Sequence, residues 1–435
     1  MNYNETLDYI NSVRLNQWKL GLSRTRELLD MLGNPQDDLN FVHVGGTNGK
    51  GSTCAMIESV LRCCGFTTGS FPSPYIEDFR ERICVSGEMI SKEDLCRITE
   101  TVKSCADRMD DEPSHFEIVT AIGMMYFKEK KCDMVVLEVG LGGEFDATNI
   151  IKAPKLSVLT NIGFDHTEYL GNTLAEIART KGGIIKHPSP VVVYPNDEEV
   201  IDTLKGLCEE RGCEMTIADF GRMKAGSADL YGQSFTWQGT SLCGGEDAEL
   251  RIPLIGEYQL RNASLALTAL EKLKEGGLDI SSAALKEGMA KVSWPARFEV
   301  MGHKPVFILD GGHNPQCADA VAESLRKYFP EGGLTFIIGV LADKDYKTVL
   351  DTLMPFAKLC YCVAPTSERA LSAEELADCV RERGVEARTF KKTEDAVRTA
   401  LEGSDPVLAF GSLYMAGEVR TAYRELMACK ETSWT

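Results

Sequence analysis

A glycine-rich turn with one lysine and two hydroxyl residues lies near the start of the chain, at residues 45–53. An apolar run at 41–44 precedes it, and an apolar pattern with helical spacing follows it. Glycines allow backbone N–H groups to converge on an anion, and the start of a helix adds the positive end of its dipole. Lys50 would reach the terminal phosphates of a nucleotide, and Ser52 or Thr53 a bound Mg²⁺. The pattern predicts a phosphate-binding loop that departs from the strict Walker A spacing. A glycine-rich turn without a ligand is the alternative.

An acid and a histidine follow two later strand-like runs. Glu138 lies near the end of residues 134–139, and His166 follows residues 156–160. Carboxyl ends of parallel strands meet at one edge of a sheet, so we expect both residues to share a crevice with the phosphate-binding loop. Mg²⁺ prefers oxygen ligands and keeps several waters. Ser73, Glu138 and His166 are therefore candidate Mg²⁺ ligands, and a structural histidine with a loop-capping glutamate is the alternative.

Two further sites allow both a structural and a functional interpretation. Lys181 lies in a helical pattern at 174–185, and ordinary helix composition favours a solvated lysine there. Asp310 and His313 follow a strand-like run, where they would face a ligand held between domains. An aspartate turn with Asn314 as the cap of the next helix is equally compatible with that segment.

The elements that would position these residues alternate between strands and helices. The strand-like runs of the first part are 41–44, 67–71, 134–139, 156–160 and 191–194. The helical patterns are 1–38, 91–109, 114–128, 174–185 and 254–274. This alternation predicts an α/β fold with a doubly wound parallel sheet. Residues 215–252 alternate polar and apolar side chains and are rich in glycine, which predicts a small β insertion.

Strand and helix patterns restart after a junction at residues 293–299. The later strand-like runs are 306–309, 336–340, 359–363 and 407–410. They predict a smaller, Rossmann-like α/β domain, of a normal domain size. We therefore expect an N-terminal P-loop-type domain at residues 1–295 and a C-terminal domain at 296–435.

The composition excludes several partners. The 435 residues include 65 acidic and 47 basic side chains, for a net charge of −18. Nucleic-acid binding is not expected, because no excess of cations is present to neutralise phosphates. Fifteen scattered cysteines without paired zinc-type spacing indicate a reducing compartment. Neither a signal-peptide pattern nor an apolar run of membrane-spanning length is present. We expect a cytoplasmic monomer with no membrane partner.

Many separated motifs resemble, in order, those of folylpolyglutamate synthase and bifunctional dihydrofolate synthase, members of the Mur ligase superfamily. The resemblance covers nearly the whole chain and is carried by residues 43–53, 73–74, 81–83, 138–143, 146–149, 165–166, 181–186, 259–263, 294–299, 310–315, 339–346 and 411–414. It implies an ATP-dependent amide ligase that adds L-glutamate to folate or dihydropteroate through an acyl phosphate. Mg²⁺ and a monovalent cation are the implied ions.

The resemblance also implies a role for each matching residue. The ATP-binding residues would be Thr47, Asn48, Gly49, Lys50, Gly51, Ser52, Thr53, Asn262, Arg297 and Asp310. The Mg²⁺ ligands would be Ser73, Glu138 and His166. The substrate-binding residues would be Arg82, His115, Phe116, Glu117, Phe145, Asp146, Ala147, His313 and Ser412. Lys50, Lys181 and His166 would be catalytic. Lys181 matches the lysine that the family carbamylates, which reverses the solvated interpretation.

Four positions depart from the family pattern. Tyr75 and Tyr258 replace usual histidines, Thr180 replaces a usual glutamate, and Glu144 replaces a usual basic residue beside the substrate loop. The alternatives are therefore a Mur-type ligase that joins another acid and amino acid, or a non-catalytic nucleotide-binding relative.

Overall fold

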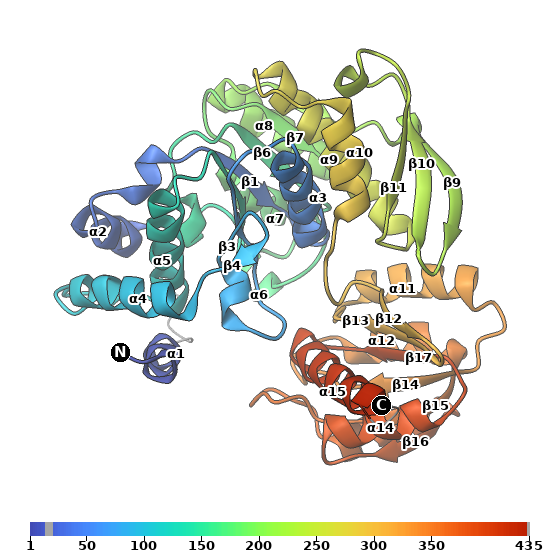
Figure 1. Cartoon of the computed structure of the whole chain (residues 1–435). Coiled ribbons are helices and arrows are strands. Elements are labelled where there is room, and N and C mark those ends of the chain that lie inside the picture. The colour runs from blue at the N-terminus through green and yellow to red at the C-terminus, as the bar shows by residue number, and fades with distance from the viewer. Residues whose placement is uncertain (14–20, 433–435) are drawn as a thin grey trace. The chain divides into compact units, whose positions relative to one another are not determined.

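The protein, seen in a computed structural model (Figure 1), is described at residues 1–13 and 21–432. The stretch 14–20 of the predicted N-terminal helical region lies outside the described residues. The chain forms two compact units. The first comprises Met1–Ala225, Phe235–Arg251 and Arg261–Val292, and the second comprises Gly226–Ser234, Ile252–Leu260 and Ser293–Thr435.

An eight-stranded sheet forms the centre of the first unit, in the order β4-β3-β2-β5-β1-β6-β7-β8. Its strands are β1 (Phe41–Gly45), β2 (Thr68–Phe71), β3 (Cys84–Val85), β4 (Glu88–Met89), β5 (Met134–Glu138), β6 (Leu156–Leu159), β7 (Val191–Val193) and β8 (Met215–Ile217). The six strands from β2 to β8 pair in parallel, and β3 and β4 pair antiparallel. The predicted doubly wound parallel sheet is confirmed.

One strand lies outside its predicted place. Residues 215–217 were expected in the β insertion, but β8 pairs in parallel with β7 at the edge of the large sheet. The helix between these two strands makes a βαβ crossover, which returns the chain parallel to β7. The insertion itself is a three-stranded sheet of β9 (Met223–Asp229), β10 (Gly232–Trp237) and β11 (Ala248–Ile252).

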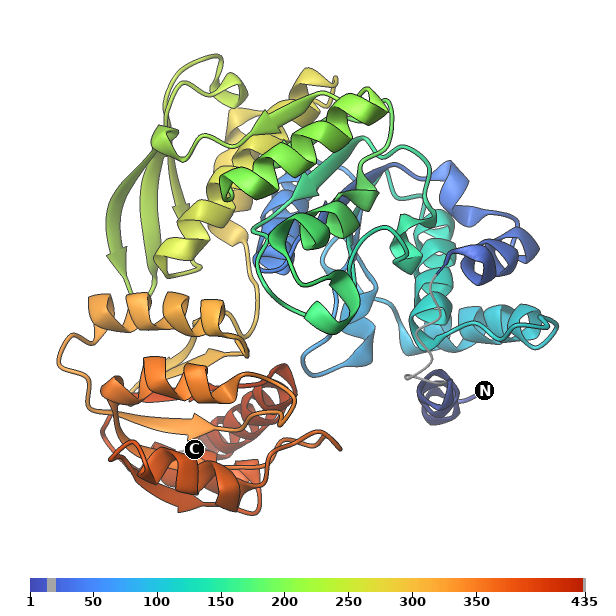
Figure 2. The same ribbon diagram turned by 180° about the vertical axis from the view of Figure 1, so that it is seen from behind.

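Helices cover both faces of the large sheet (Figures 1 and 2). They are α1 (Tyr3–Ser12), α2 (Ser23–Met31), α3 (Lys50–Cys63), α4 (Lys92–Ala106), α5 (His115–Glu129), α6 (Thr167–Leu170), α7 (Leu174–Lys181) and α8 (Glu198–Arg211), followed by α9 (Glu257–Glu275) and α10 (Ser282–Lys291). The Thr68 hydroxyl donates to Glu58 of α3 at 2.9 Å, whereas a Cβ at Gly69 would lie 2.8 Å from Phe127 of α5. Successive strand residues face opposite sides, so α3 and α5 cover opposite faces.

Helix α7 is shorter than the predicted segment 174–185. It ends at Lys181, and a 3₁₀ turn at Gly182–Ile184 follows. Glycine is a poor helix former. The second glycine of this turn, Gly183, also allows a close approach, because a Cβ there would lie 2.6 Å from the backbone nitrogen of Glu144. The end of α7 is therefore fitted against the loop that follows β5.

The second unit contains a six-stranded sheet in the order β12-β13-β17-β14-β15-β16. Its strands are β12 (Glu299–His303), β13 (Val306–Asp310), β14 (Leu334–Ile338), β15 (Ala357–Cys362), β16 (Glu386–Thr389) and β17 (Val407–Phe410). Its helices are α11 (Pro315–Tyr328), α12 (Tyr346–Leu353), α13 (Ala373–Arg381), α14 (Thr393–Glu402) and α15 (Leu413–Thr432). The predicted smaller Rossmann-like fold is confirmed, and the edge strands β12 and β16 are additions to it. None of the described helices is long and apolar enough to cross a membrane.

Candidate active site

The predicted phosphate-binding loop joins the end of β1 to the start of α3. Gly49 precedes the helix in a left-handed conformation with φ 89°, and no side chain of the described residues caps this end. The first N–H groups of an α-helix have no partner inside the helix. Thr47 anchors the loop, because its N–H donates to the Asn161 carbonyl at 2.7 Å and its hydroxyl to the Gly163 carbonyl at 3.1 Å. The loop is a fixed turn whose helix end suits an anion.

Two glycines of this loop leave no room for a side chain. At Gly46, with φ 138°, a Cβ would lie 1.9 Å from the Thr160 hydroxyl oxygen. At Gly49, a Cβ would lie 2.5 Å from the Asn262 side-chain oxygen. Asn262 of α9 thus lies directly beside the loop, and its role in ATP binding stays a prediction. The loop, the helix end and the amide side chain together form a turn that could hold an anion.

Two lysines converge on the same side of the loop. Lys50 donates to the carbonyls of Gly46 at 3.2 Å and Thr47 at 3.0 Å. Lys181, at the end of α7, donates to the Gly46 carbonyl at 3.0 Å. The side chain of Lys181 is buried, so the composition-based expectation of a solvated lysine is wrong. Burial, with the charge of Lys50 as a second cause, lowers the pKa of Lys181 to about 7.

The predicted metal ligands lie on the same edge of the sheet. Glu138 ends β5 beside Val44 of β1, and its carboxylate accepts a hydrogen bond from the Ser73 N–H at 3.0 Å. His166 precedes α6 as its N-cap residue, in a left-handed conformation, with its ring nitrogen Nε2 3.8 Å from the Asp165 carboxylate. Within residues 1–13 and 21–432 no three acidic, histidine or cysteine side chains gather as a metal centre. One carboxylate and one hydroxyl nevertheless suit Mg²⁺, which takes most of its oxygens from water and phosphate.

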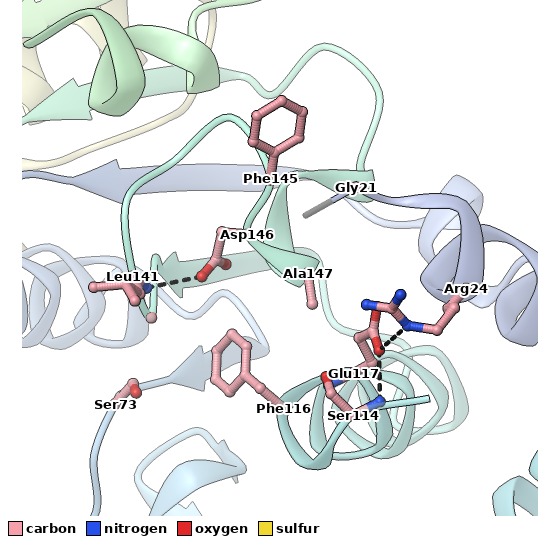
Figure 3. Close-up of a pocket in the computed structure, with 11 residues that line it drawn as sticks. Gly21, Arg24, Ser73, Ser114, Phe116, Glu117, Leu141, Phe145, Asp146 and Ala147 are labelled. Carbon is pink, nitrogen blue, oxygen red and sulfur yellow. Dashed lines mark hydrogen bonds and ion pairs between the residues drawn. The ribbon is translucent and has the colours of Figure 1, made fainter. Parts of the chain in front are cut away.

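A pocket of about 230 Å³ opens beside Ser73 (Figure 3). It is lined by Gly21, Arg24, Ser73, Ser114, Phe116, Glu117, Gly140, Leu141, Phe145, Asp146 and Ala147. Five of the substrate-binding residues implied by the resemblance are in this lining: Phe116, Glu117, Phe145, Asp146 and Ala147. The aromatic rings of Phe116 and Phe145 give it apolar surface, and the two acids give it polar groups. Apolar and aromatic side chains with a few polar groups are typical of the lining of small-molecule sites.

Glu117 forms a buried ion pair with Arg24 at one wall of the pocket. It accepts hydrogen bonds from Arg24 Nε at 3.1 Å, from the Thr25 hydroxyl at 3.0 Å and from the Ser114 N–H at 2.6 Å. Figure 3 shows the guanidinium of Arg24 reaching across to this carboxylate. Arg24 was not among the predicted residues. Its partner lies on a different helix, far away in sequence, and no local pattern indicates the pair.

Asp146 is held at the opposite wall. Its carboxylate accepts hydrogen bonds from the Leu141 N–H at 2.8 Å, the Thr148 N–H at 3.0 Å and the Thr148 hydroxyl at 2.5 Å. Burial raises the pKa of Asp146, and these donors oppose that rise. The carboxylate therefore joins both ends of the loop that carries Phe145.

Two of the four predicted substrate-binding residues outside the lining, His115 and Arg82, belong to the first unit. His115 turns its ring to the Ile10 carbonyl at 2.8 Å, and burial lowers its pKa. Arg82 packs between two aromatic rings, with its guanidinium carbon 5.7 Å from the centre of the Phe116 ring and 5.8 Å from that of Tyr75. Arg82 thus supports a wall of the pocket from behind, whereas His115 ties α5 to α1.

The remaining candidates lie in the second unit. Asp310 ends β13 and accepts hydrogen bonds from the N–H groups of Phe298 and Gly312, both at 2.7 Å. Arg297 is close to the same turn, since a Cβ at Gly311 would lie 3.0 Å from its guanidinium. Burial raises the pKa of Asp310, and the charge of Arg297 opposes the rise.

His313 and Ser412 follow neighbouring strands of the second unit. β13 and β17 pair in parallel, so their carboxyl ends lie together. The His313 ring is 3.3 Å from the Gly311 carbonyl, and the Ser412 hydroxyl accepts a hydrogen bond from the Tyr414 N–H at 3.2 Å. The second unit therefore presents its four candidates at one edge of its sheet, the edge where ligands bind in open α/β folds.

Comparison with known proteins agrees with this fold. The Mur ligase middle domain family matches residues 44–270, and the Mur ligase glutamate ligase domain family matches residues 296–413. The chain is therefore a Mur-type ligase in its domain composition.

Relatives that are similar over nearly the full length of the chain show which family of Mur-type ligases it belongs to. The chain is 35% identical over 413 residues to the dihydrofolate synthase/folylpolyglutamate synthase of Bacillus subtilis, covering 92% of this chain and 94% of the relative. Its fold matches that of the folylpolyglutamate synthase from Thermotoga maritima, with a TM-score of 0.86, 32% identity and coverage of 97% and 96%. It also matches FolC of E. coli in complex with DHPP and ADP, with a TM-score of 0.85, 28% identity and coverage of 99% of both chains. The chain belongs to the folylpolyglutamate synthase/dihydrofolate synthase family.

Proposed function

We propose that the protein is an ATP-dependent ligase that joins L-glutamate to the free carboxylate of a folate or of dihydropteroate. The observation that carries this proposal is the place of Ser73. Ser73 lines the pocket, and its N–H also donates to Glu138 at the end of β5, beside the strand that leads into the phosphate-binding loop. A substrate whose ring system fills the pocket would thus extend its acid toward the γ-phosphate of ATP.

The residues of the loop are suited to activation of that acid. A carboxylate is a poor electrophile, so its oxygen must first accept the γ-phosphoryl group to give an acyl phosphate and ADP. Lys50 and the N–H groups at the start of α3 would stabilise the charge on the transferred phosphoryl group. Mg²⁺, held by Glu138, Ser73 and His166, would neutralise further phosphate charge. The amine of glutamate then attacks the acyl carbon, the amide bond forms and phosphate leaves.

In this proposal Lys181 reacts with CO₂ and becomes a carbamate. A buried amine with a pKa of about 7 is neutral in about half of the molecules at neutral pH, and the neutral form can react with CO₂ to form a carbamate. The product would be an anion in place of a cation beside Lys50. Asn262, Arg297 and Asp310 would bind the nucleotide, and His313 and Ser412 the glutamate side of the reaction.

The decisive experiment follows ADP release by the purified protein with ATP, Mg²⁺, L-glutamate and one of three acids: dihydropteroate, tetrahydrofolate or tetrahydrofolate triglutamate. We expect ADP release that requires both glutamate and one of these acids, with a product one glutamate longer by mass spectrometry. Lys50→Ala is the matched inactive control. Release that depends on a different amino acid, or none with any of the acids, would contradict the proposal.

A further inference from the structure

Three buried side chains, linked by hydrogen bonds, connect the pocket wall to the strand that leads into the phosphate-binding loop. His43 lies in the middle of β1, and its Nε2 is 2.9 Å from the Thr148 hydroxyl oxygen. That hydroxyl donates to Asp146, which lines the pocket. His43 and Thr148 are fully buried, and Asp146 is 5% exposed. None of the roles discussed above involves His43, and it does not line the pocket.

The protons available to His43, Thr148 and Asp146 determine which group donates each hydrogen bond. A threonine hydroxyl has one proton to donate. With that proton directed to the Asp146 carboxylate, the oxygen of Thr148 accepts a hydrogen bond, so Nε2 of His43 carries the ring proton. Nδ1 of His43 is buried without a hydrogen-bond partner in the part of the chain that the structure describes. A proton on Nδ1 would therefore have no acceptor.

The position of His43 in a central strand is a second indication that its ring has a functional role. Its neighbours Val42 and Val44 are buried, and a central parallel strand normally consists of such apolar residues. A buried imidazole without full hydrogen bonding destabilises the fold relative to an apolar side chain. Burial lowers the pKa of His43 to about 3, so the ring is neutral. The hydrogen bond of its Nε2 connects the ring to Thr148 and through it to Asp146 in the pocket lining.

We propose that His43 is a positioning residue for the folate-type substrate. Its Nε2–H orients the Thr148 hydroxyl, which holds the Asp146 carboxylate. That carboxylate in turn binds the N–H groups of Leu141 and Thr148 and so fixes the pocket loop between them. This inference rests on the proposed function of the same pocket. His43 then contributes to binding of the acid substrate and not of ATP, although β1 leads into the ATP-binding loop.

A pair of variants separates this role from simple packing. In His43→Gln, the amide nitrogen can replace Nε2 as the donor to Thr148, whereas His43→Leu fills the space without a donor. We expect His43→Leu to raise KM for the acid substrate about tenfold or more, as for a lost hydrogen bond to a charged network, with KM for ATP nearly unchanged. His43→Gln should restore most of the affinity. Equal impairment in both variants, or an unchanged acid KM in His43→Leu, would overturn the proposal.

The tautomer of His43 provides a test that does not depend on ligase activity. In long-range ¹H–¹⁵N spectra of the wild-type protein labelled at its six histidines, we expect one ring with its proton on Nε2 that does not titrate between pH 5 and 8, the range in which an ordinary histidine titrates. The signal absent from His43→Gln identifies it. A proton on Nδ1 would reverse the chain and overturn the proposal. If the wild type shows the Nε2 tautomer but no ligase activity, it is the proposed function that fails.

Discussion

Lys50 and Lys181 donate hydrogen bonds to one and the same atom, the carbonyl oxygen of Gly46, at 3.2 and 3.0 Å. Two side-chain amines that share one acceptor repel each other when both are protonated. Lys181 is the buried member, and its pKa of about 7 makes it the one that loses its proton. Burial, and then the charge of Lys50, therefore leave Lys181 available for chemistry as a neutral amine.

Lys181 should carry a carboxyl group on Nζ in bicarbonate buffer. The neutral amine attacks CO₂, an N–C bond forms and one proton is released to solvent. The lowered pKa sets the sign: as pH falls through about 7 the amine becomes an ammonium without a lone pair, so carbamate and activity should both decrease. ¹³C NMR with labelled bicarbonate measures the adduct. Lys181→Ala should lose activity and recover part of it with a small added carboxylate. Full activity with an unmodified Lys181 would exclude this role.

Lys50→Ala should reduce turnover by about 10²–10³-fold, the usual effect of losing one transition-state contact. The thermal midpoint should stay close to that of the wild type, because among the described residues Lys50 donates only to the loop carbonyls of Gly46 and Thr47. Steady-state kinetics and a melting curve on the same sample check both expectations. Near-normal turnover would remove the loop lysine from the mechanism.

Gly46→Ala should destabilise the protein by clearly more than the roughly 1 kcal/mol of a typical substitution. The new Cβ would lie 1.9 Å from the Thr160 hydroxyl oxygen, in a backbone conformation with φ 138°. Gly206→Ala in α8 is the matched control. That position has nothing within 4 Å, so alanine there should stabilise the helix by about 0.5–1 kcal/mol. Urea unfolding of the two variants should therefore give shifts of opposite sign.

Arg24→Met should cost about 3–5 kcal/mol of stability, because it leaves the Glu117 carboxylate buried without its cation. Arg24→Met combined with Glu117→Gln should recover much of that loss. The exposed pair Lys103–Asp107 provides the control, since Lys103→Met should change stability by less than about 1 kcal/mol. Similar shifts for Arg24→Met and Lys103→Met would mean that the Arg24 pair is effectively solvated.

Glu144→Arg should favour substrates that already carry extra γ-glutamates over dihydropteroate. Glu144 is exposed, and no ion pair with Arg82 or with another described residue holds it. A charge in this position acts on the substrate through water. The substitution should therefore change the preference between the two acids by about 1 kcal/mol, and this change should decrease as salt rises. Comparison of kcat/KM for dihydropteroate and for tetrahydrofolate triglutamate measures it, with Glu144→Gln as the intermediate. Equal changes for both acids would show that Glu144 does not face the substrate tail.

The sequence by itself determined the features whose signal is local. The phosphate-binding loop combines glycine spacing, a preceding apolar run and a following helical pattern within about 20 residues, and the structure contains each of these elements. Helix starts such as that of α5 were also readable, because Ser114 and Glu117 form a capping box over four positions. Apolar strand runs predicted the parallel sheet for the same reason: side-chain period and burial are properties of short segments.

Only the tertiary structure decided which distant residues share a site. Lys181 has the sequence context of a solvated helix lysine, but folding places the end of α7 against the phosphate-binding loop, where Lys181 donates to the Gly46 carbonyl. The Arg24–Glu117 pair and the chain from His43 through Thr148 to Asp146 join residues about 90 or more positions apart. Such contacts depend on strand order and helix packing, so no pattern of nearby residues encodes them. The pKa of Lys181 has the same origin, since burial and a neighbouring charge exist only after folding.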